Sequence, residues 1–181
     1  LLILGTPGWM FRPLIQRNMI FRLARLITRP VPAFFMFNAT FSIWHIPALY
    51  NLSVISHEVH IAEHLLFIAT AMIMWWPLTS NVPELPRLSY PLAIIYLFLL
   101  SIAQIIVFAP ITFSREPLYE WYVDAPRIFG LSPLTDQQLG GIIMKIGGAA
   151  IFLPLLIVLF FRWYSREEDE NRIDEVLVEA R

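Results

Sequence analysis

The chain has 181 residues, of which 57% are hydrophobic and only 15% are charged, and its mean hydropathy is +0.63. This composition excludes an ordinary soluble domain and predicts an all-α, polytopic transmembrane helical bundle. The formal net charge of −1 gives no sign of nucleic-acid binding, because the basic residues lie beside apolar segments and form no single patch. The chain has no cysteine, which excludes disulfides, thiolate metal sites, iron–sulfur clusters and C-x-x-C-H haem attachment.

The N-terminal part of the chain is basic. Residues 5–30 contain five arginines and no acidic residue, so we expect an interfacial segment on the cytoplasmic side of a membrane. The chain begins with Leu1 and not with Met, and residues 1–4 resemble the end of an apolar run. We therefore expect further membrane spans to precede this segment, and we expect residues 1–181 to form one membrane domain.

Four apolar segments are long enough to cross a membrane as helices, because a span needs about 20 residues. These segments are residues 31–50, 57–78, 90–113 and 138–163. Basic segments stay on the cytoplasmic side, so the arginines place the loop 51–56 and the net acidic loop 114–137 outside. The charged tail, residues 164–181, then lies in the cytoplasm as a solvated amphipathic helix.

All four histidines fall within a window of 20 residues, at positions His45, His57, His60 and His64. The predicted topology places them in the outer part of the membrane, where a buried histidine is costly without a partner. Spans 31–50 and 57–78 are joined by a short loop and must be antiparallel neighbours, so His45 and His64 can face each other at similar depth. His57 lies at the interface and is the weakest candidate for a ligand.

Met144 enters the last span from outside and reaches a comparable depth. Imidazoles with a thioether suit copper, particularly Cu(I), whereas imidazoles with Asp136 or Glu63 suit Cu(II) or zinc. Because histidine is the commonest metal-ligating side chain, we predict a metal site in this region. Its predicted ligands are His45, His60, His64 and Met144, with His57 as a weaker member.

Three charged residues lie close to these predicted ligands. Glu63 can orient a histidine or pair with Lys145. Lys145 can also pair with Asp136 or extend toward water. We expect all three to support the site.

Two alternatives to a copper protein remain open. Two histidines on facing helices can hold a b-type haem in an electron carrier. The histidines can also hydrogen-bond between helices in a metal-free structural subunit or chaperone of a respiratory complex. No set of residues indicates bond-breaking chemistry, so we do not expect an enzyme.

Several motifs together resemble the CtaG family of cytochrome c oxidase assembly factors, the type found with bacterial caa3 oxidases. These motifs are Leu4-Gly5-Thr6-Pro7-Gly8, Trp44-His45-Ile46-Pro47, His60-x-x-Glu63-His64, Trp75-Trp76-Pro77-Leu78, and Ser132 to Gly141 followed by Met144. The resemblance extends from Leu1 to about Trp163.

The resemblance implies a protein of about seven spans in the bacterial cell membrane that delivers or inserts copper during oxidase maturation. Its implied partners are cytochrome c oxidase subunits and membrane lipid. It also implies a further histidine-containing motif in a span ahead of the Gly-Thr-Pro turn. The residues that match family motif positions are His45, His60, His64, Asp136 and Met144, whereas His57 lies outside them.

Overall fold

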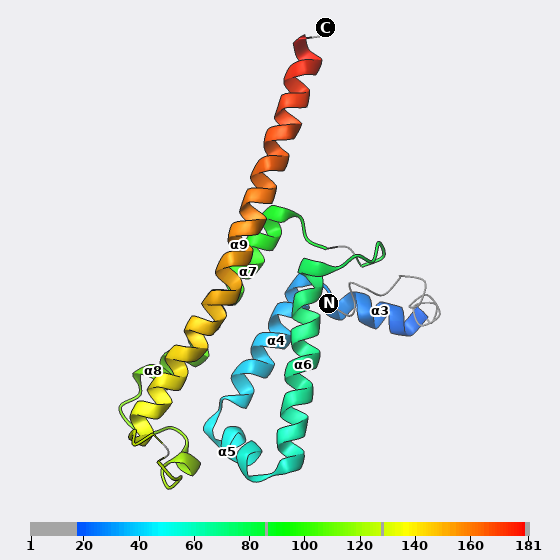
Figure 1. Ribbon diagram of the computed structural model, residues 1–181. Coiled ribbons are helices and arrows are strands. Elements are labelled where there is room, and N and C mark those ends of the chain that lie inside the picture. Colours follow the sequence, from blue (N-terminus) through cyan, green and yellow to red (C-terminus); the bar gives the residue numbers. More distant parts are fainter. Residues whose placement is uncertain (1–17, 86, 128, 180–181) are drawn as a thin grey trace.

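The structure is a computed structural model that describes residues 18–85, 87–127 and 129–179. Every regular element in this part of the chain is a helix (Figure 1). The first described helix, α3 (Asn18–Ile27), belongs to the predicted basic segment and carries exposed arginines and exposed apolar side chains. This mixture suits a helix at a membrane surface. The earlier part of the basic segment, including the Gly-Thr-Pro turn, lies outside the described residues.

Three helical segments of the described chain are long and apolar enough to cross a membrane: His57–Thr79, Tyr90–Phe113 and Pro133–Glu179. The first is α6 and the last is α9, which contains the whole predicted span 138–163. The middle segment consists of α7 (Tyr90–Ala103) and α8 (Ile105–Phe113), which meet at Gln104. The prediction of a helical membrane protein is therefore confirmed.

The predicted span 31–50 differs from this pattern, because it is not one helix. It consists of α4 (Pro30–Trp44) and α5 (Pro47–Ile55), separated by a turn. A residue before proline is pushed away from helical geometry, and Ile46, which precedes Pro47, is extended with ψ 129°. With 15 residues and a rise of 1.5 Å per residue, α4 is roughly 22 Å long, which is shorter than the hydrocarbon layer. The count of four spans is therefore not confirmed.

The helices pack as two groups. α4 lies along α6, while α7 and α8 lie along α9 (Figure 1). A core cluster joins the groups where Met74 of α6 meets Tyr96 and Leu97 of α7 and Phe152 of α9. The Tyr96 hydroxyl donates a hydrogen bond of 3.1 Å to the carbonyl of Met74. Many large apolar side chains remain exposed on the outer faces of these helices, as expected for surfaces that contact lipid or other helices.

α9 continues without interruption from the apolar span into the charged tail and projects beyond the other helices (Figure 1). Ion pairs one helical turn apart stabilise this extension, including Arg166 to Glu170 at 2.8 Å and Arg172 to Glu168 at 3.5 Å. The prediction of a helical tail is confirmed as far as Glu179, and the last two residues lie outside the described part.

Candidate functional site

His45 lies at the turn between α4 and α5, and the turn fixes the state of its ring. Because α4 ends here, the backbone N–H of His45 donates to the carbonyl of Ser42, at 3.2 Å, and not to that of Phe41. The Phe41 carbonyl therefore lacks its usual backbone partner. The His45 ring fills that place, with Nδ1 2.6 Å from the Phe41 oxygen. A carbonyl only accepts, so Nδ1 carries the hydrogen and the neutral ring keeps its free electron pair on Nε2.

The loop between α8 and α9 folds over this turn. It contains the short helix η2 (Glu120–Tyr122). Tyr119 is buried, and its hydroxyl donates a hydrogen bond of 3.1 Å to the backbone carbonyl of His45. Its ring packs against Tyr50 of α5 at a centroid distance of 4.2 Å. The Tyr50 hydroxyl in turn lies 3.3 Å from that of Tyr122. Three tyrosines therefore fasten the α8–α9 loop to α5 and the α4–α5 turn.

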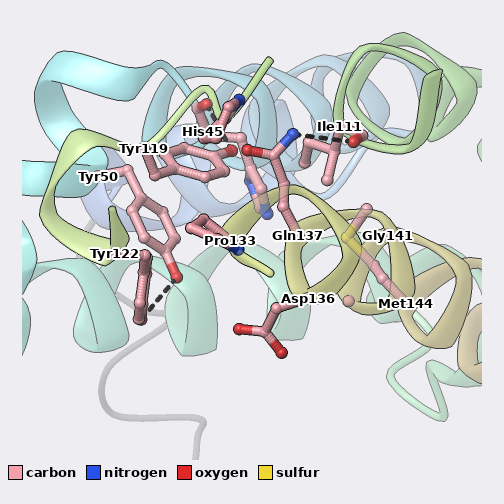
Figure 2. Close-up of a pocket in the computed structure, with 12 residues that line it drawn as sticks. His45, Tyr50, Ile111, Tyr119, Tyr122, Pro133, Asp136, Gln137, Gly141 and Met144 are labelled. Atoms are coloured by element: carbon pink, nitrogen blue, oxygen red, sulfur yellow. Dashed lines mark hydrogen bonds between the residues drawn. The ribbon is translucent and has the colours of Figure 1, made fainter. Parts of the chain in front are cut away.

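A pocket of about 340 Å³ lies beneath this loop (Figure 2). Its volume falls in the range of small ligand sites. The wall combines an imidazole, phenols, a carboxylate and a thioether. The residues that matter most for its chemistry are His45, Tyr50, Tyr119, Tyr122, Asp136 and Met144.

One stripe of α9 forms the far wall of the pocket. Asp136, Gly140 and Met144 recur every four residues, so they lie on one face of the helix. A Cβ atom on Gly140 would meet nothing within 4 Å, so this glycine leaves the pocket open. Gly141 has a different role, because a Cβ there would overlap the Thr112 hydroxyl of α8. Gly141 therefore allows α8 and α9 to approach closely beside the pocket.

Glutamine side chains from α9 hold the first part of the α8–α9 loop. The Gln137 side chain donates to the Ile111 carbonyl at 3.1 Å and accepts from the Leu118 amide at 2.6 Å. Gln138 donates to the Ser114 carbonyl at 3.0 Å. The bonds to Ile111 and Ser114 satisfy carbonyl groups that the end of α8 leaves without helical partners.

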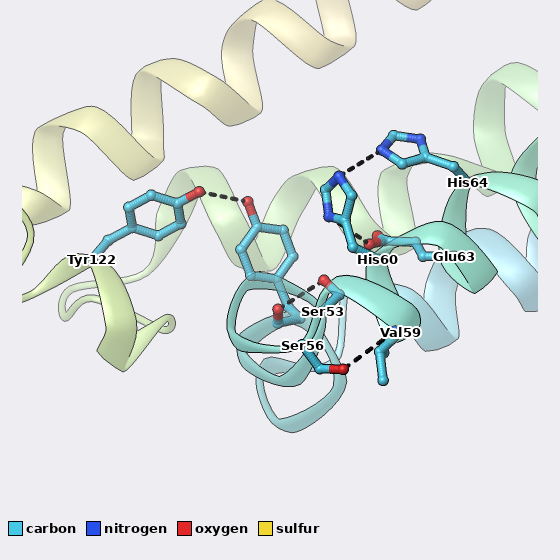
Figure 3. Close-up of polar contacts among 8 residues, drawn as sticks. Ser53, Ser56, Val59, His60, Glu63, His64 and Tyr122 are labelled. Carbon is cyan, nitrogen blue, oxygen red and sulfur yellow. Dashed lines mark hydrogen bonds and ion pairs between the residues drawn. The ribbon is translucent and has the colours of Figure 1, made fainter.

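His60 and His64 form a pair on α6, one helical turn apart. Their Nε2 atoms lie 3.0 Å from each other, and both rings project from the same side of the helix (Figure 3). Both residues are exposed. Glu63 is largely buried beside them, with its carboxylate 4.0 Å from Nδ1 of His60. Glu63 is therefore placed to orient His60 when that ring is protonated on Nδ1.

The structure thus separates the predicted ligands into two sets. His45 and Met144 share the pocket with Asp136, whereas neither His60 nor His64 lines it. Within the described residues, no three His, Asp or Glu side chains lie close enough to hold one ion. His57 belongs to neither set, because it is exposed at the first position of α6, directly after the capping residue Ser56.

Lys145 forms none of the carboxylate pairs that the sequence suggested. Its ammonium donates a hydrogen bond of 3.0 Å to the carbonyl of Ser101, near the end of α7. A cation at this position interacts favourably with the negative end of the helix dipole. We therefore assign Lys145 to the junction of α7, α8 and α9 and not to the histidines.

A family model described as cytochrome c oxidase caa3 assembly factor matches residues 1–166. The chain belongs to this family. The match confirms the resemblance found in the sequence motifs and covers all predicted ligands of this caa3 assembly factor. No curated protein and no solved structure matches the chain.

The assembly factor contains site residues that the sequence motifs did not indicate. These residues are Tyr50, Tyr119 and Tyr122, which line the pocket. Gln137, which holds the loop that carries two of them, belongs to the motif from Ser132 to Gly141. The sequence shows a cluster of aromatic residues in the loop 114–137, but such a cluster is also typical of side chains at a membrane interface. Only the folded loop shows that two of these tyrosines contact α5 and the α4–α5 turn.

Proposed function

We propose that this assembly factor binds copper near the outer surface of the bacterial cell membrane and passes it to a cytochrome c oxidase subunit. Copper is then the cargo of the protein, and the protein is not an enzyme. Membership of the caa3 assembly factor family supports the role in oxidase assembly. The observation that carries the copper proposal is the pairing of His60 with His64.

Two nitrogens bound tetrahedrally to one ion at about 2.0–2.1 Å lie roughly 3.3–3.4 Å apart. The Nε2 atoms of His60 and His64 are already 3.0 Å apart, so a small rotation of the rings brings them to that separation. Histidines four residues apart on one helix face are a known arrangement for holding a metal. The exposed position of the pair leaves room for ligands from an incoming protein, which a delivery site requires.

The same geometry favours copper over the two alternatives. Axial ligands of a haem approach the iron from opposite sides, whereas His60 and His64 project from one side of one helix (Figure 3). A purely structural role expects histidines bonded to a neighbouring helix. The two imidazoles instead contact each other on an exposed face.

The outer location rests on the distribution of charge. In the chain, α4 and α5 separate the arginine-rich segment around α3 from the start of α6. If the arginines face the cytoplasm, then His60 and His64 face outward. Copper bound there is accessible to an oxidase subunit with an outward-facing domain.

Copper analysis of the full-length protein, purified in detergent and loaded with Cu(I), tests the proposal. We expect copper in the wild type and a lower copper content in the double variant His60→Ala, His64→Ala. His57→Ala is the matched control, because it removes an exposed histidine from the same helix and is expected to keep the wild-type content. Unchanged copper in the double variant, or none in the wild type, contradicts the proposal.

A further inference from the structure

We propose that the pocket around His45 is a second copper site, distinct from the His60–His64 pair and selective for Cu(I). This inference rests on the proposed function, since it assumes that the protein carries copper. In this proposal His45, Met144 and Asp136 form a site of their own. The sequence instead suggested a single site shared with His60 and His64.

His45 is prepared to act as a ligand before any metal arrives. Histidines that bind metals commonly donate their other ring N–H to a backbone carbonyl, which fixes the tautomer and the orientation of the ring. The hydrogen bond from Nδ1 of His45 to the Phe41 carbonyl, at 2.6 Å, is such an arrangement. Within the described residues Nε2 has no hydrogen-bond partner, and the residue lines the pocket (Figure 2).

The fold also prevents the ring from turning away. The centroid of the Phe41 ring lies 4.5 Å from that of the His45 ring, and the centroid of the Phe67 ring, on α6, lies 6.4 Å from it. On the backbone side, Tyr119 holds the His45 carbonyl. The position of a potential metal-binding nitrogen is therefore fixed from three directions.

The other donors of the pocket determine its selectivity. Met144 supplies a soft thioether, which favours Cu(I) over Cu(II) and zinc. Asp136 lies two stripe positions from Met144, on the side of the loop, and adds an oxygen donor and a negative charge at the rim. Gly140 lies between them without a side chain, so space for an ion remains along this face of α9.

The two sites differ in access. His60 has a side chain that is 50% exposed, whereas the α8–α9 loop with its buried Tyr119 lies over part of the pocket. An exposed imidazole pair exchanges ions readily with other proteins. A thioether ligand protects Cu(I) from oxidation, because soft sulfur prefers Cu(I) to Cu(II). We therefore expect the pocket to retain copper under competition that empties the pair.

The test uses the full-length protein in detergent, loaded with Cu(I) and then dialysed, with copper measured per protein and X-ray absorption measured at the copper edge. We expect two copper ions per wild-type protein and a sulfur ligand in the absorption spectrum. Met144→Leu, which conserves side-chain volume, is expected to lose one copper and the sulfur signal. Met72→Leu is the matched control, because Met72 is an exposed methionine on α6 outside the pocket, and it is expected to keep both.

The outcomes separate this inference from the proposed function. The inference is supported if the double variant His60→Ala, His64→Ala retains one copper with a sulfur ligand. It is overturned if Met144→Leu keeps as much copper as the wild type. If the double histidine variant then loses all copper, the proposed function still stands. His45→Phe provides an independent check: loss of one copper in a monodisperse protein supports the pocket, and retention of two contradicts it.

Discussion

The hydroxyl of Tyr119 donates a hydrogen bond of 3.1 Å to the backbone carbonyl of His45, 74 residues earlier in the chain. This bond joins the α8–α9 loop to the turn that breaks the first apolar segment. Tyr119→Phe removes the bond but preserves the ring that packs on Tyr50. We expect the free energy of unfolding to fall by roughly 0.5–1.5 kcal/mol. Thermal unfolding in detergent measures this change, and Tyr164→Phe on the exposed part of α9 is the control, expected to match the wild type.

Tyr119 also predicts a dependence of stability on alkaline pH. Burial raises the pKa of Tyr119 to about 12, because burial disfavours the charged phenolate. A tyrosine in the unfolded chain ionises near pH 10. The raised pKa therefore leaves stability intact below about pH 10 and lowers it as pH rises from about 10 to 12, where the unfolded chain binds fewer protons. Unfolding measured across this range is expected to show a smaller decrease in Tyr119→Phe, and an equal decrease in both proteins would contradict the assignment.

The contact between α8 and α9 gives a prediction for two glycines of one helix. In Gly141→Ala the new methyl group overlaps the Thr112 hydroxyl and lies 3.1 Å from a methyl carbon of Ile111. We expect a loss of roughly 1–3 kcal/mol, typical of overpacking. Gly147→Ala is the matched control, because its Cβ meets nothing within 4 Å. Alanine has the higher helix propensity, so the control is expected to be neutral or more stable.

Substitutions of Gln137 are expected to loosen the α8–α9 loop to different degrees. Gln137→Leu removes the bonds to both Ile111 and Leu118, so we expect a loss of roughly 1–3 kcal/mol and faster proteolysis between α8 and α9. Gln137→Glu keeps the acceptor for the Leu118 amide but loses the donor, so its cleavage rate is expected to exceed that of the wild type. Limited proteolysis compares the three proteins, and equal cleavage rates would show that Gln137 does not hold the loop.

Much of the fold was predictable from residue type alone. The apolar run 57–78 is preceded by Ser56, a good N-cap residue, and α6 begins directly after it. The run 90–113 is helical throughout except near Gln104, where the backbone of α7 and α8 is interrupted. Length and hydropathy are local properties, so they identify such segments without knowledge of the packing.

The turn at His45 was harder to predict. Pro47 was visible within the segment 31–50, but membrane helices often tolerate proline, so the sequence did not distinguish a kink from a complete break. The break matters for the site, because His45 at this turn lines a pocket together with residues of α9. The expectation that His45 and His64 face each other assumed a continuous helix. The tyrosine contacts of the α8–α9 loop depend on tertiary packing and leave no periodic signal in the sequence.

The most direct test of the account measures copper in the oxidase itself. In cells that lack this protein and grow at limiting copper, oxidase is purified after complementation with the wild type or a variant, and its copper content and activity are measured. We predict that the wild type and His57→Ala restore both, whereas the double variant His60→Ala, His64→Ala, present in membranes at equal amounts, restores neither. Full restoration of oxidase copper by the double variant would contradict the account.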